Sequence, residues 1–304
     1  MSINQWDEQY VPSEHVHGTE HIMIDQTEAA ATKDMVREKY SQIATQTKEQ
    51  NAASCCGAGG CSTVDYTIFA EDYSKLKGYV EGADLALGCG IPTEFAQISE
   101  GDTVVDLGSG AGNDAFVARA LVGESGKVIG IDMTPAMIDK ARENADKLGF
   151  NNVEFRLGEI EHIPIAANRA DVVVSNCVLN LVPDKHRAFA EMFRILKPGG
   201  HFSVSDVVLR GELPDALKHD AEMYAGCVAG AIQEADYLRL LKEVGFEDIQ
   251  VQKEKPVVLP DDLLRACLTQ DEIDSMHARR DGICSITVYG KKLQVQCNPQ
   301  SGCC

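Results

Sequence analysis

From residue 103 onward, short runs of β-branched and other apolar residues alternate with longer stretches of helical periodicity. This alternation constrains the fold more than any other feature, because it is typical of a parallel sheet covered by helices on both faces. The predicted strands cover residues 103–107, 127–131, 153–157, 171–175, 201–208, 249–253 and 284–291, and the intervening helices cover residues 114–121, 135–148, 184–196, 214–227 and 233–244. We therefore expect an α/β fold with a doubly wound, seven-stranded, mostly parallel, Rossmann-like sheet.

The N-terminal segment does not follow this pattern. Residues 1–30 are polar and show no apolar period, so we expect a loosely held arm there. A helix is predicted over residues 32–47, followed by a glycine-rich loop that carries Cys55, Cys56 and Cys61. The sheet should therefore carry an N-terminal extension.

Charge and cysteine content narrow the function. The 304-residue chain has a formal net charge of −19 and no basic run, so nucleic acid is not an expected partner. It has neither an apolar stretch that could span a bilayer nor a leader-like start, and we expect a cytoplasmic protein with no membrane partner. Eleven cysteines could indicate a disulfide scaffold, but the length and the α/β pattern favour catalytic or redox thiols.

A glycine-rich turn follows the first predicted strand. In the run VVDLGSGAGN, Gly108, Gly110 and Gly112 occupy alternate positions before a helix. Glycine permits a tight turn and a close approach of the backbone to a ligand, as in nucleotide-cofactor sites. A dinucleotide-binding dehydrogenase is the nearest rival, but its third glycine or alanine would fall at position 113, where this chain has Asn113.

Two acids stand at the ends of the first two strands. Asp106 is placed to accept a hydrogen bond from a cationic amine, and Asp132 is placed to bind a ribose diol. Met133, next in the chain, can pack on an adenine face. This part of the sequence therefore predicts a nucleoside-containing cofactor.

The glycine spacing resembles the first motif of class I methyltransferases, which use S-adenosylmethionine. The segments RLGEIE at 156–161 and LKPGG at 196–200 agree with that resemblance. It implies that Glu159 and Ile160 flank the adenine. The candidate cofactor-binding residues are Asp106, Gly108, Ser109, Gly110, Gly112, Asn113, Asp132, Met133, Glu159, Ile160 and Asn176.

Four cysteine motifs point to the methyl acceptor. They are SNCVLN at 175–180, YAGCVAGA at 224–231, LGCG at 87–90 and SCCG at 54–57, the first of them at the strand end where ligands of open α/β sheets bind. In this combination they resemble the arsenite methyltransferase family, in its microbial form, over about residues 33–255.

The resemblance implies three regions. Residues 1–65 would form the N-terminal arm, helix and Cys-rich loop, and residues 66–255 the S-adenosylmethionine-binding methyltransferase domain. Residues 256–304 would form a C-terminal substrate-binding region with the last strand and a cysteine-containing tail.

The same resemblance implies that Cys89, Cys177 and Cys227 bind As(III), with Cys56 or its neighbour Cys55 as the redox partner of Cys89. As(III) is soft and thiophilic, and three thiolates leave its lone pair available as the nucleophile. The methyl-transfer step removes no proton from the substrate, so it needs alignment and exclusion of water but no general base.

The expected activity is transfer of methyl groups from S-adenosylmethionine to As(III), giving mono- and dimethylated arsenicals for detoxification, with trimethylated arsenicals left open. Methylation formally oxidises arsenic, and thiols can return two electrons by forming a disulfide. Thioredoxin or glutathione is therefore the expected reductant and partner of a monomeric enzyme.

Other interpretations remain open at this point. A quinone-type methyltransferase acting on carbon or oxygen would share the sheet and the glycine turn, and a metalloid-sequestering thiol protein would share the cysteines. The cluster of Cys55, Cys56 and Cys61 could be half of a zinc site. Cys267 and Cys284 are expected to be small core residues, because cysteine is among the most buried residue types.

Overall fold

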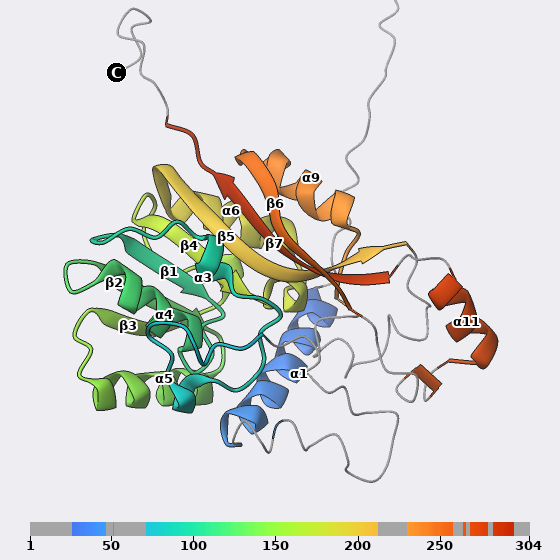
Figure 1. Ribbon diagram of the computed structural model, residues 1–304, viewed down its shortest axis with the longest axis horizontal. Coiled ribbons are helices and arrows are strands. Elements are labelled where there is room, and N and C mark those ends of the chain that lie inside the picture. Colours follow the sequence, from blue (N-terminus) through green and yellow to red (C-terminus); the bar gives the residue numbers. More distant parts are fainter. Residues whose placement is uncertain are drawn as a thin grey trace, which may run out of the picture.

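The computed structural model describes residues 26–46, 51, 71–211, 230–257, 264–265, 268–278 and 282–294. These residues form three layers, in which helices cover both faces of one twisted sheet (Figure 1). The expected fold class is thereby confirmed. In this part of the chain, no helix combines the length and the apolar character that crossing a bilayer would need.

Seven strands form the sheet in the order β3-β2-β1-β4-β5-β7-β6. Strands β1 to β5 run parallel, and β7 lies antiparallel between β5 and β6. The strand order reverses between β1 and β4, which is the point where open α/β sheets bind ligands. The bounds are β1 Thr103–Leu107, β2 Lys127–Asp132, β3 Val153–Leu157, β4 Ala170–Asn176, β5 Leu196–Arg210, β6 Glu247–Val257 and β7 Gly282–Lys291.

The helices begin and end where local chemistry favours it. Pro135 opens α5, the Asp184 carboxylate accepts from the Arg187 N–H at the start of α6, and left-handed Gly149 and Gly245 end α5 and α9. The bounds are α1 Gln26–Ala44, α3 Pro92–Phe95, α4 Asn113–Val122, α5 Pro135–Leu148, α6 Lys185–Ile195, α9 Glu234–Val244 and α11 Gln270–Ala278. Short 3-10 turns are η3 Glu81–Ala83, η4 Ile160–His162 and η5 Leu179–Leu181.

All seven predicted strands are present within a few residues of their expected bounds. The helix expected over 32–47 begins earlier, at Gln26, and ends at Ala44. The helix predicted over 214–227 lies outside the described residues.

Two apolar layers hold the helices to the sheet. On one face, α6 and α9 bury Phe189 and Tyr237 against Phe202 of β5. On the other, α4 and α5 pack around Phe116 and Phe155. Strands buried on both faces explain why these segments read as almost continuous apolar runs.

Removing the Phe116 ring should destabilise the fold strongly. The ring is fully buried and touches Phe150 and Phe155, so Phe116→Ala should lower the free energy of unfolding by roughly 3–5 kcal/mol in urea titrations. Leu121→Ala on the same helix is the matched control, because Leu121 is 38% exposed and should cost about 1 kcal/mol or less. Equal losses for the two variants would contradict this account of the core.

Candidate functional site

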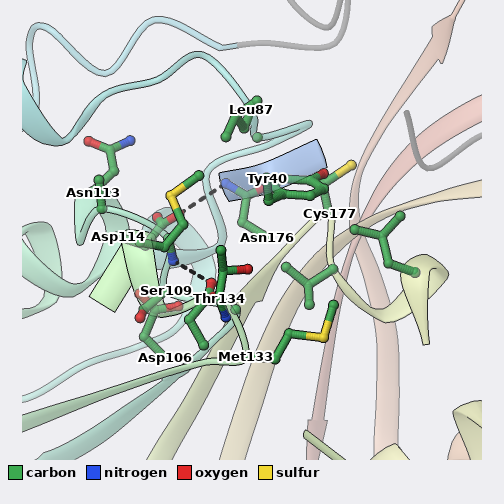
Figure 2. A pocket seen from close by; sticks show the side chains of 18 of the residues that line it. Tyr40, Leu87, Asp106, Ser109, Asn113, Asp114, Met133, Thr134, Asn176 and Cys177 are labelled. Carbon is green, nitrogen blue, oxygen red and sulfur yellow. Dashed lines mark hydrogen bonds between the residues drawn. The ribbon is translucent and has the colours of Figure 1, made fainter. Parts of the chain in front are cut away.

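A cavity opens at the carboxyl ends of β1, β2 and β4, where the strand order reverses (Figure 2). Ten of the eleven residues expected to bind the cofactor line it. The exception, Gly112, lies behind the wall as the left-handed residue before α4, where a Cβ would meet the Phe116 ring at 2.7 Å. The cavity thus unites residues that the sequence placed on separate loops.

Gly108, the first glycine of the turn, lies too close to the segment after β4 to carry a side chain. Gly108 has φ +70°, and a Cβ there would stand 2.2 Å from a methyl carbon of Val178, the residue after Cys177. The N–H groups of Gly108 and Ser109 both donate to the Ile131 carbonyl, which fixes the turn to β2. Glycine is therefore required here by close approach as well as by backbone conformation.

Several buried polar atoms in this wall have no hydrogen-bond partner within the described residues. They are Asp106 Oδ2, Ser109 Oγ and Asn113 Oδ1. Buried polar atoms usually find partners, so this group indicates a polar ligand. Burial, with the nearby Asp114 and Asp132 carboxyls, raises the pKa of Asp106 well above its usual range. A cationic amine bound here would offset that desolvation, so the donor set fits the amino acid end of S-adenosylmethionine.

The Asp132 carboxylate organises the rim of the cavity. Its oxygens accept from the Gly110 N–H at 3.0 Å and the Thr134 N–H at 2.8 Å, which joins the glycine turn to the start of α5. Met133 and Ile160 supply apolar surface to the same cavity. This rim suits a ribose and an adenine, as the sequence predicted; binding itself stays a prediction.

Helix α1 forms a wall of the cavity that the sequence did not predict. Lys33, Val36 and Tyr40 line the space from this helix, which lies along the carboxyl edge of the sheet in Figure 1. The Lys33 ammonium donates to Glu159 at 2.8 Å and pairs with Glu161, and its hydrogen bond lowers the pKa of Glu159. The carboxylate expected beside the adenine is thus also an anchor for α1.

Asn176, the last residue of β4, links the two ends of the cavity. Its Oδ1 accepts from the Cys89 N–H at 3.0 Å, and its Nδ2 donates to Asp114 Oδ2 at 3.0 Å, the bond drawn in Figure 2. The same amide nitrogen lies 2.8 Å from both the Tyr73 hydroxyl and the Gly90 carbonyl. Asn176 was expected to bind the cofactor, but these four contacts occupy its amide with the protein itself.

The loop that carries Cys89 is pressed against β4 and β5. A Cβ on Gly88 would lie 2.5 Å from Asn176 Nδ2, and one on Gly90 would lie 2.5 Å from Ser205 Oγ. The Ser285 hydroxyl donates to the Cys89 carbonyl at 2.6 Å. The glycines of the LGCG motif are needed because only a bare backbone fits on both sides of this thiol.

Cys89 and Cys177 come together although 88 positions separate them in the chain. Their Sγ atoms and a carboxylate oxygen of Asp206 all lie within 4.8 Å of one another, and all three residues are buried. Cys177 has φ +59°, a left-handed conformation that is uncommon for a residue with a side chain, and its N–H donates to the Ser205 carbonyl at 2.8 Å. Cys177 also lines the cavity, so its thiol faces the same cavity as the residues expected to bind the cofactor.

Asp206 belongs to this group but was not predicted. It lies in the buried part of β5 between Ser205 and Val207, and an acid within a strand predicted to lie in the sheet was the available signal. Its oxygens accept from the Val207 N–H at 3.0 Å and the Tyr237 hydroxyl at 3.3 Å. Burial raises the pKa of Asp206 to about 7.

Three predicted site cysteines, Cys55, Cys56 and Cys227, lie outside the described residues, as does Cys61. Cys284 lies in the core of the sheet, as expected. Sequence reasoning missed Tyr73 and Asp114, whose hydroxyl and carboxylate meet at 2.9 Å on the cavity wall. A polar residue next to Asn113 was the only hint for Asp114.

Asp114 should make stability depend on pH. Burial raises its pKa to about 6, although hydrogen bonds from Asn176 and Tyr73 lower it. The stabilising effect of the protonated form is fully present below the unfolded-state pKa of about 4 and is lost as pH rises through 6. Relative to Asp114→Asn, the ligand-free chain should lose on the order of 1 kcal/mol of unfolding free energy between pH 5 and 8. Urea titrations that give parallel pH profiles for the two proteins would contradict this.

Comparisons with known proteins show which family this chain resembles. Residues 98–245 match the family model of a methyltransferase domain. The arsenite methyltransferase of Halobacterium salinarum is 44% identical over 242 residues, which is 75% of this chain and 61% of that protein. The arsenite methyltransferase of Aquipseudomonas alcaligenes is 33% identical, over 76% of this chain and 66% of its own length. The chain thus spans about two thirds or less of these curated relatives.

A solved structure extends the likeness to the fold. The crystal structure of an arsenic(III) S-adenosylmethionine methyltransferase from Chlamydomonas reinhardtii superposes with a TM-score of 0.57 at 36% sequence identity, covering 69% of this chain and 68% of that one. Identity at this level over more than two thirds of both chains shows that the protein belongs to the arsenite methyltransferase family.

Proposed function

We propose that this protein transfers methyl groups from S-adenosylmethionine to As(III) held by Cys89, Cys177 and Cys227. The observation that carries the proposal is that the first two thiols lie within 4.8 Å of each other and that Cys177 lines the cavity of the cofactor motif. Metal–thiolate bonds of about 2.3 Å place two sulfurs on one atom no more than about 4.6 Å apart. A small side-chain adjustment therefore suffices for both to bind arsenic.

S-adenosylmethionine supplies an electrophilic methyl group on a sulfonium. In this cavity Asp106 would accept from its amine, Asp132 would face the ribose, and Met133 with Ile160 would flank the adenine. The apolar side chains of Val178, Leu181 and Val182 also line this cavity. Such a lining favours methyl transfer because it excludes water from the sulfonium.

Arsenic bound by thiolates keeps its lone pair, so the protein must align the nucleophile and need not remove a proton. Each transfer oxidises arsenic by two electrons, which thiols can return by forming a disulfide. We assign that disulfide to Cys89 with Cys56 or Cys55, and its reduction to thioredoxin or glutathione in the cytoplasm. The products would be mono- and dimethylated arsenicals, and the role detoxification.

Replacing one arsenic-binding thiol should abolish turnover of arsenite. With arsenite, methyl-labelled S-adenosylmethionine and a dithiol, Cys177→Ser should form labelled arsenicals at least a hundredfold more slowly than the wild type, because oxygen is a poor ligand for a soft metalloid. Cys284→Ser is the matched control: this buried thiol lies in the sheet core and its loss should change the rate less than twofold. Absence of labelled arsenicals from the wild type would refute the proposed activity.

Cys227 should matter only for the unmethylated substrate. Monomethylarsonous acid already carries one carbon on arsenic and needs two thiols, which Cys89 and Cys177 provide. Cys227→Ser should therefore lose activity on arsenite and retain it on monomethylarsonous acid. Chromatography of the labelled products measures both, and equal losses on the two substrates would count against the assignment of Cys227.

A further inference from the structure

Asp206 places a carboxylate at the arsenic site proposed above. One of its oxygens lies within 4.8 Å of the sulfurs of Cys89 and Cys177, and the residue is 1% exposed. Asp206 lies on β5, which is held from two sides. On one side β5 pairs with β4, which ends one residue before Cys177, and on the other side it pairs with β7. The sheet itself therefore sets its distance from the thiols.

Among the described residues, the hydrogen bonds to this carboxylate come from two neutral donors, the Val207 N–H and the Tyr237 hydroxyl. The Lys185 ammonium acts on it through space while donating to the carbonyls of Asn180 and Val182. No ion pair within 4 Å involves Asp206 in this part of the protein. Within the described residues no cation contacts the buried Asp206 carboxyl directly, so arsenic that becomes positive beside it would favour its ionised form.

Direct ligation is the weaker explanation for a carboxylate in this position. A carboxylate oxygen is a hard donor, whereas As(III) prefers the soft sulfur of thiolates. The methyl-transfer step, however, creates a cation at this point. The arsenic lone pair forms the As–C bond, the C–S bond of the sulfonium breaks with its electron pair staying on sulfur, and one positive charge passes from sulfur to arsenic. No proton moves.

We propose that the Asp206 carboxylate stabilises the positive charge that develops on thiolate-bound arsenic as it accepts the methyl group. This inference rests on the proposed function. A fixed negative charge beside a developing cation in a site shielded from water lowers the barrier, because the interaction is strongest in the transition state. The same carboxylate contributes little to binding of arsenite, which forms a neutral complex with three thiolates.

The test separates binding from methyl transfer. Asp206→Asn keeps the shape of the side chain and removes its charge. Equilibrium filtration with arsenite alone and calorimetry with S-adenosylmethionine should give dissociation constants within threefold of wild type. Single-turnover methyl transfer to arsenite should be about a hundredfold slower, the scale found when one preorganised electrostatic group is lost.

Ser203→Ala is the matched control. Ser203 is a buried polar residue of the same strand that donates to the Pro92 carbonyl at 2.8 Å, away from the thiols, and its loss should leave the single-turnover rate within twofold of wild type. If circular dichroism shows that Asp206→Asn does not fold, the smaller neutral variant Asp206→Ser takes its place in the same measurements.

Two results would overturn the inference: a neutral variant that transfers methyl at the wild-type rate, or one whose arsenite affinity falls as far as its rate, which would make Asp206 a ligand or a structural group. Either leaves the proposed function intact, because the wild type still methylates arsenite. A wild type that binds S-adenosylmethionine but transfers no methyl to arsenite would instead refute the function, and this inference with it.

Discussion

The amide of Asn176 is the interaction on which the rest of the site depends. An amide offers an acceptor and two donor hydrogens on one rigid plane, so it can hold the backbone of Cys89 with its oxygen and the Asp114 carboxylate with its nitrogen. Because Asn176 ends β4, the sheet fixes both contacts. The thiol loop and the cofactor wall are therefore parts of one rigid unit, which is what alignment of a nucleophile with a methyl group demands.

Around this junction the protein buries several carboxyl groups, among them those of Asp106, Asp114 and Asp206. Burial raises the pKa of each, which means that the ligand-free fold holds them at a cost in stability. In the proposed function, the positive charge of the bound sulfonium would offset this cost. The formal net charge of −19 contributes little to the electrostatics of the site, because solvent and salt screen exposed charges. The few buried carboxyl groups are screened much less.

The sheet could be predicted almost entirely from the sequence, because its central strands are rich in apolar and β-branched residues and the helices between strands carry their own start and stop signals. The part of the cavity that is lined by the glycine turn and the strand ends could be predicted, because sequence motifs mark those residues. Helix α1 could not be placed, since nothing local indicates that Lys33 would meet Glu159, 126 positions away. Asp206 was missed for a related reason. Its neighbours Cys89 and Cys177 lie on other segments of the chain, and a single acid within a strand does not indicate which residues it will contact.

The position of β7 has a consequence for how the protein is made. This strand is the last described element, yet it lies between β5 and β6 and supplies the Ser285 hydroxyl that holds the Cys89 carbonyl. During synthesis from the N-terminus, β1 to β4 can pair while later residues are still in the ribosome. The contact of Ser285 with the Cys89 loop can therefore form only after residue 285 has emerged, later than the pairing of the strands that precede the glycine turn and Cys177.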